Sequence, residues 1–367
     1  MRKVKIGIIG CGNISGIYLE NLTRTFANTE VYAISDISEE RMAAAAEKYG
    51  IPNQWTAEQI LASPEIEIVL NLTTPGDHFR ICRLALEHGK HVYVEKPLSL
   101  LPEQGSELVE LAREKGLLLG GAPDTFLGAG LQTSRKLIDD GYIGTPVAAT
   151  AFMLGHGHEN WHPNPAFYYQ AGGGPMFDMG PYYLTALVSL LGPAQTVAGM
   201  TAKSFEQRTI TSEPLFGEKI DVEVPTHIAG TLRFRGGAVA TMITSFDVWS
   251  STLPFIEIYG TLGTLLVPDP NNFGGPVLLR PAGANEFKEI PVVHQYAENS
   301  RGLGIADMAH CIVNGGTPRA NGELANHVLE IMHAFHTSSD SGVYAELTTT
   351  CEQPRPLPLG LVRGYVE

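Results

Sequence analysis

Cysteine is scarce in this 367-residue sequence, which has only Cys11, Cys82, Cys311 and Cys351. The four are widely spaced and form neither a CxxC pair nor a disulfide framework, so a reducing cytoplasm is the setting we expect. No uninterrupted apolar run of about 18 residues is present, and we expect no membrane span. The charged start leads straight into a strand-like run and lacks the apolar core and cleavage site of a signal peptide.

Positive charge is also in deficit. The chain has 25 Lys and Arg against 39 Asp and Glu, a formal net charge of −14. This balance opposes non-specific binding to nucleic acid or to anionic membranes, and we expect neither as a partner. With 44% hydrophobic and 17% charged residues, the composition is that of a soluble globular protein. The length predicts two domains.

The first residues carry a dinucleotide-binding pattern. Residues 4–9 predict a buried parallel strand, Gly10-Cys11-Gly12-Asn13-Ile14-Ser15-Gly16 follows, and a helical run continues through Phe26. Gly10 allows the tight turn, Gly12 lets the backbone approach a pyrophosphate, and the helix that opens at Asn13 and Ile14 supplies N–H groups. The alternative is a tight turn in an unrelated α/β domain.

Asp36 closes the second predicted strand, about 20 residues after the glycines. A carboxylate at this distance can hold ribose hydroxyls and repels a 2′-phosphate, which predicts NAD as cofactor. Arg41, one turn into the next helix, can offset that repulsion and leaves room for NADP.

Strands and helices continue to alternate up to residue 120, which predicts a doubly wound parallel sheet with ligands at the carboxyl ends of its strands. Two loops fall at such ends: Thr73-Thr74-Pro75 and Glu95-Lys96-Pro97. His78 lies on the helix after the first loop, where a surface role is its plainest interpretation. We expect these residues to contact the cofactor.

Near residue 121 the pattern changes. A helix is predicted over residues 127–140 and a strand over 146–158, and residues 196–293 are rich in β patterns and short turns, as in an antiparallel sheet. A closing helix is expected over residues 323–338. The predicted fold is α/β, with a Rossmann domain over 1–122, a substrate-binding α/β domain with a large open, mainly antiparallel sheet over 123–343, and a C-terminal tail over 344–367.

Three consecutive glycines, residues 172–174, precede a helical run that carries Asp178 and Tyr182. Glycines let the backbone come close to something, and the i, i+4 spacing puts the carboxylate and the phenol on one helix face. We expect a proton-handling site there. Tyr182 is the predicted base, Lys96 stabilises its phenolate, and Asp178 orients Lys96 or a substrate hydroxyl. The alternatives are a capping acid, a core tyrosine and a solvated lysine.

The segment from His156 to His162 includes His158, Glu159 and Trp161. Its imidazoles and indole suit sugar hydroxyls and ring C–H groups, but three histidines and a glutamate can also ligate a metal, and a plain surface loop is the third interpretation. We favour sugar binding and no metal. Asp124 is a further candidate for the cleft, and residues 167–169 are aromatics that line it or merely pack.

Together these motifs resemble the Gfo/Idh/MocA oxidoreductases over nearly the whole chain. The resemblance is carried by Gly10-Cys11-Gly12-Asn13-Ile14, Thr74-Pro75 with His78, Glu95-Lys96-Pro97, and the glycines leading to Asp178. It implies a Rossmann domain that binds NAD or NADP, a second domain whose open sheet joins chains into a homodimer or homotetramer, and sugar or polyol substrates. Lys96 and Asp178 match the family's lysine and aspartate. Many members have histidine where this chain has Tyr182, which makes an inositol substrate less secure.

We therefore expect an NAD(P)-dependent sugar or polyol dehydrogenase, with catalytic Lys96, Asp178 and Tyr182. One alternative is a glycosidase that uses bound NAD for transient oxidation and elimination. The other is a non-catalytic dinucleotide-binding regulator, against which the presence of Lys96 and Tyr182 argues. The sequence does not select the sugar, the carbon or the direction.

Overall fold

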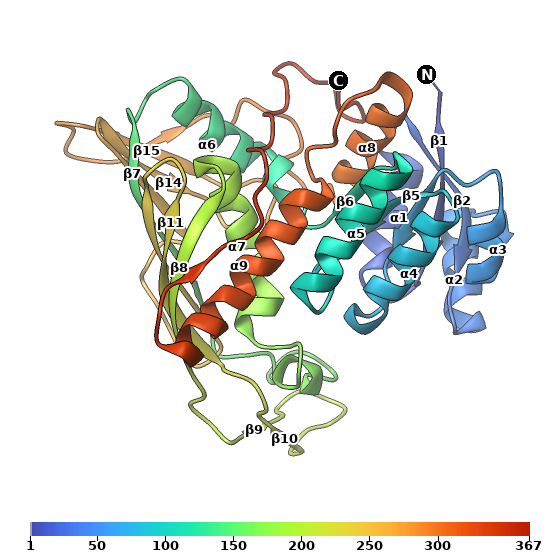
Figure 1. Cartoon of the computed structure of the whole chain (residues 1–367), viewed down its shortest axis with the longest axis horizontal. Helices are drawn as coiled ribbons and strands as arrows, with labels where there is room; N and C mark the ends of the chain where they lie inside the picture. The colour runs from blue at the N-terminus through green and yellow to red at the C-terminus, as the bar shows by residue number, and fades with distance from the viewer. Residues whose placement is uncertain (1) are drawn as a thin grey trace.

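The computed structural model describes residues 2–367, which build two large sheets standing side by side (Figure 1). The first sheet has six parallel strands in the order β3-β2-β1-β4-β5-β6. Its strands are β1 (Val4–Ile9), β2 (Thr29–Ser35), β3 (Asn53–Gln54), β4 (Ile68–Asn71), β5 (His91–Val94) and β6 (Leu119–Gly121). Its helices are α1 (Ser15–Arg24), α2 (Glu39–Tyr49), α3 (Ala57–Ala62), α4 (Pro75–Glu87) and α5 (Pro102–Lys115). The doubly wound parallel sheet expected from the sequence is confirmed.

Local sequence explains these elements. The side chains of β4 are all buried, as in a parallel strand covered on both faces. Ser38 caps α2 by accepting from the Arg41 N–H, and Gly50 ends that helix with a left-handed backbone (φ 69°). Proline occupies the first position of α5, where its missing N–H costs nothing.

The second sheet has nine strands in the order β16-β15-β14-β13-β7-β12-β11-β8-β17. Among the described strands of this sheet, β7 and β12 form the one parallel pair, so the sheet is mainly antiparallel as expected. Its strands are β7 (Pro146–Leu154), β8 (Ala194–Ala202), β11 (His227–Phe234), β12 (Val239–Ser245), β13 (Ile256–Gly260), β14 (Gly263–Val267), β15 (Val277–Pro281), β16 (Lys288–Ile290) and β17 (Ala345–Glu346). A separate hairpin, β9 (Gln207–Thr209) and β10 (Lys219–Asp221), projects from the lower end of the view in Figure 1.

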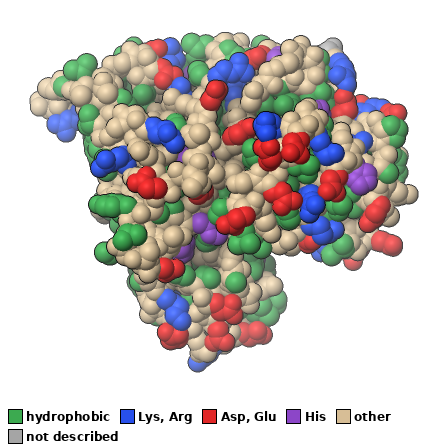
Figure 2. Space-filling model, viewed as in Figure 1, with side chains coloured by type: hydrophobic (Ala, Val, Ile, Leu, Met, Phe, Trp, Pro, Cys, Tyr) green, Lys and Arg blue, Asp and Glu red, His purple; other side chains and the backbone are tan. Residues whose placement is uncertain are grey.

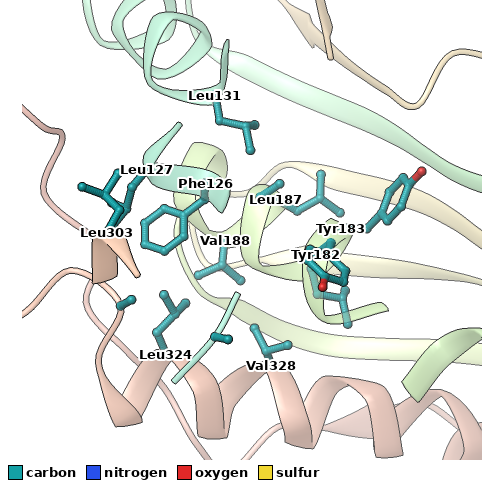
Figure 3. Close-up of a cluster of buried hydrophobic side chains, with 14 of the residues drawn as sticks. Phe126, Leu127, Leu131, Tyr182, Tyr183, Leu187, Val188, Leu303, Leu324 and Val328 are labelled. Carbon is teal, nitrogen blue, oxygen red and sulfur yellow. The ribbon is translucent and has the colours of Figure 1, made fainter. Parts of the chain in front are cut away.

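Helices pack between the two sheets. They are α6 (Ala129–Asp139), α7 (Pro175–Leu191), α8 (Leu303–Asn314) and α9 (Gly322–Ser341), with the short 3₁₀ turn η1 (Thr125–Leu127). A second 3₁₀ turn, η2 (Ala166–Tyr169), lies against β10. Figure 3 shows part of the resulting core, in which Phe126, Val188, Leu303 and Leu324 come together from four of these elements. This core continues into the parallel sheet, so both halves of the chain share it.

Two expectations about elements need correction. The strand predicted over residues 146–158 ends at Leu154, so His156 and His158 lie in the loop beyond β7 and not on one strand face. Helix α8 was not predicted, because Gly302, Gly304 and Gly315 interrupt and flank its apolar run. Within residues 2–367, no helix combines the length and the apolar character needed to cross a membrane.

Candidate active site

The turn after β1 has the shape that a pyrophosphate needs. Gly10 adopts φ +106°, and a Cβ there would lie 2.6 Å from the Leu72 carbonyl, so the turn must be glycine. On the Cβ side of Gly12, in contrast, no heavy atom of the described chain lies within 4 Å. Helix α1 starts beside this open space, with neither a side-chain cap at Ile14 nor an acid in its first turn. The N-terminus of such a helix favours an anionic phosphate.

Asp36 follows β2 and is almost fully engaged by protein groups. Its Oδ2 accepts from the Cys11 N–H at 2.6 Å, and its Oδ1 accepts from the Ser38 N–H and the Arg41 guanidinium, both at 2.7 Å. Burial raises the pKa of Asp36, but these hydrogen bonds and the Arg41 charge outweigh burial and lower it. The carboxylate therefore stays ionised beside the turn, and a ribose would compete with Arg41 for it.

His78 is not the surface residue that its position in the sequence indicates, because only 1% of it is exposed. Its Nδ1 lies 2.6 Å from the Pro97 carbonyl and its Nε2 lies 3.0 Å from the Thr73 carbonyl. The ring thus joins the loop after β4 to the loop after β5. Thr74 and Pro75 are exposed at the edge of the sheet, where a cofactor can reach them.

Lys96 lies in the loop after β5, and the side chain of the preceding residue, Glu95, holds its backbone. The buried Glu95 accepts from the Tyr18 hydroxyl of α1 at 2.7 Å and from the Lys96 N–H at 2.9 Å. Lys96 is not a solvated surface lysine: its Nζ donates to the Asp178 carbonyl oxygen at 2.8 Å and to Asp178 Oδ1 at 3.0 Å. Burial lowers the pKa of Lys96, but the charges of Asp178, Tyr182 and Glu95 raise it well above the ordinary value.

The three glycines before α7 approach the protein's own backbone. A Cβ on Gly173 would lie 2.6 Å from the Phe167 carbonyl oxygen, so this close contact is with η2. Gly174, at φ 89°, then turns the chain into α7, where Pro175 is the first residue. Asp178 follows on the first turn. Burial raises its pKa, but Lys96 and then His158 lower it to about 2.

Tyr182 lies one turn after Asp178 and is 8% exposed. Lys96 Nζ lies 5.6 Å from its ring centroid, and Arg301 Cζ lies 6.0 Å from it. Burial raises the pKa of the phenol, and although Lys96 and Arg301 oppose this, the pKa stays raised. Lys96 thus favours the phenolate, as expected from the sequence, but burial has the larger effect on this pKa. Because its pKa is raised, Tyr182 is protonated at neutral pH.

Of the three predicted histidines, His158 is the one that reaches Asp178. Its Nε2 lies 3.3 Å from Asp178 Oδ2, and its ring stacks on Tyr168 with centroids 3.7 Å apart. His156 faces elsewhere and stacks on Trp249 at 3.4 Å. His162 packs edge-on against Tyr168 and beside Trp161, which is 61% exposed. The histidines thus do not form one cluster.

The loop that carries the histidines is held by further contacts. Glu159 and Arg208 form a buried ion pair that holds the loop carrying the histidines. Tyr169 is fully buried, whereas Phe167 is half exposed. Within residues 2–367, no group of three or more His, Cys, Asp and Glu side chains is arranged to hold a metal ion.

Asp124 does not reach an open cleft. It is 1% exposed, and its Oδ2 accepts from the N–H groups of Gly302 (2.9 Å) and Gly304 (3.0 Å) at the start of α8. Burial raises its pKa to about 6. The substrate-binding role expected for Asp124 is thus replaced by a helix-capping position, which the unpredicted α8 explains.

Arg301 is the residue beside the site that sequence reasoning missed. It lies in the loop before α8, about 120 residues after Tyr182, and no motif marks it. Figure 2 shows the face on which the molecule is hollowed between its lower projection and its right-hand half. The amino end of β1 is at the top in Figure 1, so the carboxyl edge of the parallel sheet faces this hollow.

Comparison with known proteins decides the family. The family model described as "Oxidoreductase family, NAD-binding Rossmann fold" matches residues 4–121, and the one described as "GFO/IDH/MocA C-terminal domain" matches residues 131–266. The chain belongs to the GFO/IDH/MocA oxidoreductase family. It is an NAD(P)-dependent oxidoreductase, and the open turn at Gly12 fits the NAD that this family binds.

Relatives of this family member are dehydrogenases and reductases. The chain is 28% identical to the 1,5-anhydro-D-fructose reductase of Ensifer adhaerens over 94% of its own length and 98% of that protein. It is 30% identical to the D-glucoside 3-dehydrogenase of Escherichia coli over 66% of its own length and 70% of that protein. Its fold is similar to that of levoglucosan dehydrogenase in complex with NADH and L-sorbose, with a TM-score of 0.81 at 20% identity, covering 95% of this chain and 100% of that one.

Proposed function

We propose that this oxidoreductase transfers hydride at a CH–OH or C=O carbon of a sugar or polyol, with Tyr182 as proton carrier. The observation that carries the proposal is the meeting of Lys96, Asp178 and Tyr182, which brings a cation from the loop after β5 next to a carboxylate and a phenol of α7. The relatives named for anhydrofructose, glucoside and inositol support the substrate class.

NAD, held by the Gly12 turn and the Thr73–Pro75 loop, supplies or accepts the hydride when bound. In reduction, the substrate carbonyl gains a proton from the Tyr182 hydroxyl as its carbon gains the hydride. In oxidation the reverse holds, and the alcohol proton passes to Tyr182. Lys96 keeps a positive charge next to the phenol and favours the phenolate that forms in reduction.

Asp178 has two parts in this proposal. Its Oδ1 fixes Lys96, and its Oδ2 lies next to His158 Nε2, which holds the imidazole beside the lysine and the phenol. Trp161 and His162 continue this wall, with an exposed indole face suited to sugar C–H groups. A hydroxyl-rich ring fits such a mixture of polar and aromatic groups better than an apolar ketone does.

A screen tests the proposal. Aldoses, inositols and keto-sugars are offered with NAD, NADP and their reduced forms, and nicotinamide absorbance is followed. We expect turnover on at least one of them that depends on Tyr182. Release of free sugar from an aryl glycoside without net change in nicotinamide absorbance would instead establish the glycosidase. Absence of turnover on every substrate, with NAD bound, would contradict the proposal and favour the regulator.

We further propose that copies of the chain associate through the face of the nine-stranded sheet opposite to α7 and α9. The support is the alternation of exposed and buried residues along β11 and β12, which leaves an outer row facing away from the core. Light scattering of the purified protein distinguishes a dimer or tetramer from a monomer.

A further inference from the structure

We propose that Arg301 is a positioning residue of the reaction, a second cation beside the Tyr182 ring. The inference rests on the proposed role of Tyr182 and adds a residue to it. The guanidinium carbon lies 6.0 Å from the Tyr182 ring centroid, and Lys96 Nζ lies 5.6 Å from the same centroid. Two cations from separate parts of the chain thus lie close to the Tyr182 ring.

Arg301 is fixed in place by two asparagine side chains. Its Nη1 donates to Asn299 Oδ1 at 3.0 Å, and its Nη2 donates to Asn271 Oδ1 at 2.8 Å. These bonds use one edge of the planar guanidinium and orient its plane. An arginine needed only to fill space would not require two amide side chains from different loops to aim it.

The backbone of the same loop is tied to both halves of the molecule. The Arg301 carbonyl accepts from Asn21 Nδ2 of α1 at 2.9 Å, and the next residue, Gly302, donates to the buried Asp124. Because α1 is the helix that meets the cofactor phosphates, the position of Arg301 is set by the element that binds NAD. Arg301 also borders a cavity of about 560 Å³, lined by Phe255, Pro268, Asp269, Asn272 and Phe273 among others.

The charged and titratable groups around Tyr182 come from several elements. Lys96 and Glu95 belong to the loop after β5, Asp178 to α7 itself, Tyr168 to η2, and Arg301 to the loop before α8. Behind them, Tyr18 hydrogen-bonds Glu95, and Asp124 faces Arg301. Glu95 favours the neutral phenol, whereas Lys96 and Arg301 favour the phenolate. Without Arg301, Lys96 is the one remaining cation of this group that lowers the pKa of Tyr182, while Glu95 and burial still raise it.

The experiment follows Tyr182 in two ways in the full-length protein. The pH dependence of kcat for alcohol oxidation is measured for the wild type, Arg301→Gln, Arg301→Lys and Tyr182→Phe. Independently of turnover, tyrosinate absorbance is titrated with pH in the wild type and in Arg301→Gln. The titration of the same protein carrying Tyr182→Phe is subtracted from each, and the difference is the titration of Tyr182. Arg363→Gln, an exposed arginine paired with Glu298, is the matched control. NAD affinity shows that each variant is folded.

We expect Arg301→Gln to shift the basic limb of the pH profile of kcat upward by about one pH unit, and the tyrosinate titration of Tyr182 by the same amount. At neutral pH, kcat for oxidation should fall about tenfold, with KM little changed. Arg301→Lys should reverse part of the pH shift and part of the loss of kcat, and Arg363→Gln should match the wild type. If Arg301→Gln moves neither the limb nor the titration while Tyr182→Phe abolishes turnover, the inference about Arg301 is wrong and the role of Tyr182 stands. If Tyr182→Phe keeps turnover, the role of Tyr182 itself is wrong.

Discussion

Lys96, at the carboxyl edge of the parallel sheet, donates hydrogen bonds to both the backbone oxygen and Oδ1 of Asp178, at the start of α7. This double contact ties the cofactor half of the chain to the helix that carries Tyr182. It also places a permanent positive charge where an oxyanion would form on a substrate or on the phenol. The chemistry proposed for this protein depends on that contact.

Cofactor choice depends on Asp36. Its carboxylate repels a 2′-phosphate, so we expect NAD to bind more tightly than NADP in calorimetric titrations at one fixed salt concentration. Asp36→Ser should improve NADP binding relative to NAD by about 10–100-fold, because it removes that charge and releases Arg41 from the ion pair. Arg41→Gln in the same background should cancel the gain. Tighter binding of NADP by the wild type would show that Asp36 does not face the ribose.

Substitutions of His158 and His156 should differ in their effect on the KM for substrate. Because His158 alone of the three contacts Asp178, His158→Asn should raise KM about tenfold and leave the Kd for NAD unchanged. His156→Asn is the matched control, since its ring stacks on Trp249, and we expect a much smaller change. Equal effects of the two substitutions on KM would contradict the assignment of His158 to the site.

The ionisation of Asp124 should make the protein less stable as pH rises. Its pKa is raised from 3.8 to about 6, so the folded state keeps its proton where the unfolded state has lost it. The free energy of unfolding therefore falls as pH rises from about 4 through 6, by up to about 3 kcal/mol. Asp124→Asn keeps an acceptor for Gly302 and Gly304 and should remove this part of the fall in chemical denaturation curves. Asp340→Asn, an exposed site, should leave it unchanged.

The pH dependence of turnover should differ between the two directions. Because the pKa of Tyr182 is raised, oxidation should speed up about tenfold per pH unit from neutral into the alkaline range, whereas reduction should stay level and fall only above that pKa. Lys96→Ala should lower kcat and move the basic limb upward, since it removes a charge that favours the phenolate. An oxidation limb that levels off near pH 7 would instead indicate a histidine base.

The sequence predicted the parts of the structure that depend on local pattern. The Gly10–Gly12 turn, the parallel sheet and the carboxyl-edge loops follow from residue type and spacing, and Lys96 and Asp178 meet as expected. The environments of His78 and Asp124 did not follow, because burial depends on elements far away in sequence. Asp124 is covered by α8, whose glycines obscure the helical pattern in the sequence. The loop before α8 places Arg301 next to Tyr182. The pKa of Tyr182 likewise depends on how completely α7 is packed, which spacing alone does not indicate.

The role of Tyr182 is tested most directly by comparing Tyr182→Phe with Tyr183→Phe on the best substrate. Both tyrosines are buried, but their rings point apart in Figure 3, and Lys96 Nζ lies 5.6 Å from the centroid of the Tyr182 ring. We predict that Tyr182→Phe lowers kcat by about 10²–10⁴-fold with the Kd for NAD unchanged, and that Tyr183→Phe stays near the wild type. Combining Tyr182→Phe with Lys96→Ala should cost less than the two separate losses together. Near-normal turnover of Tyr182→Phe, with loss of turnover in His158→Asn, would contradict the account and place the proton on His158.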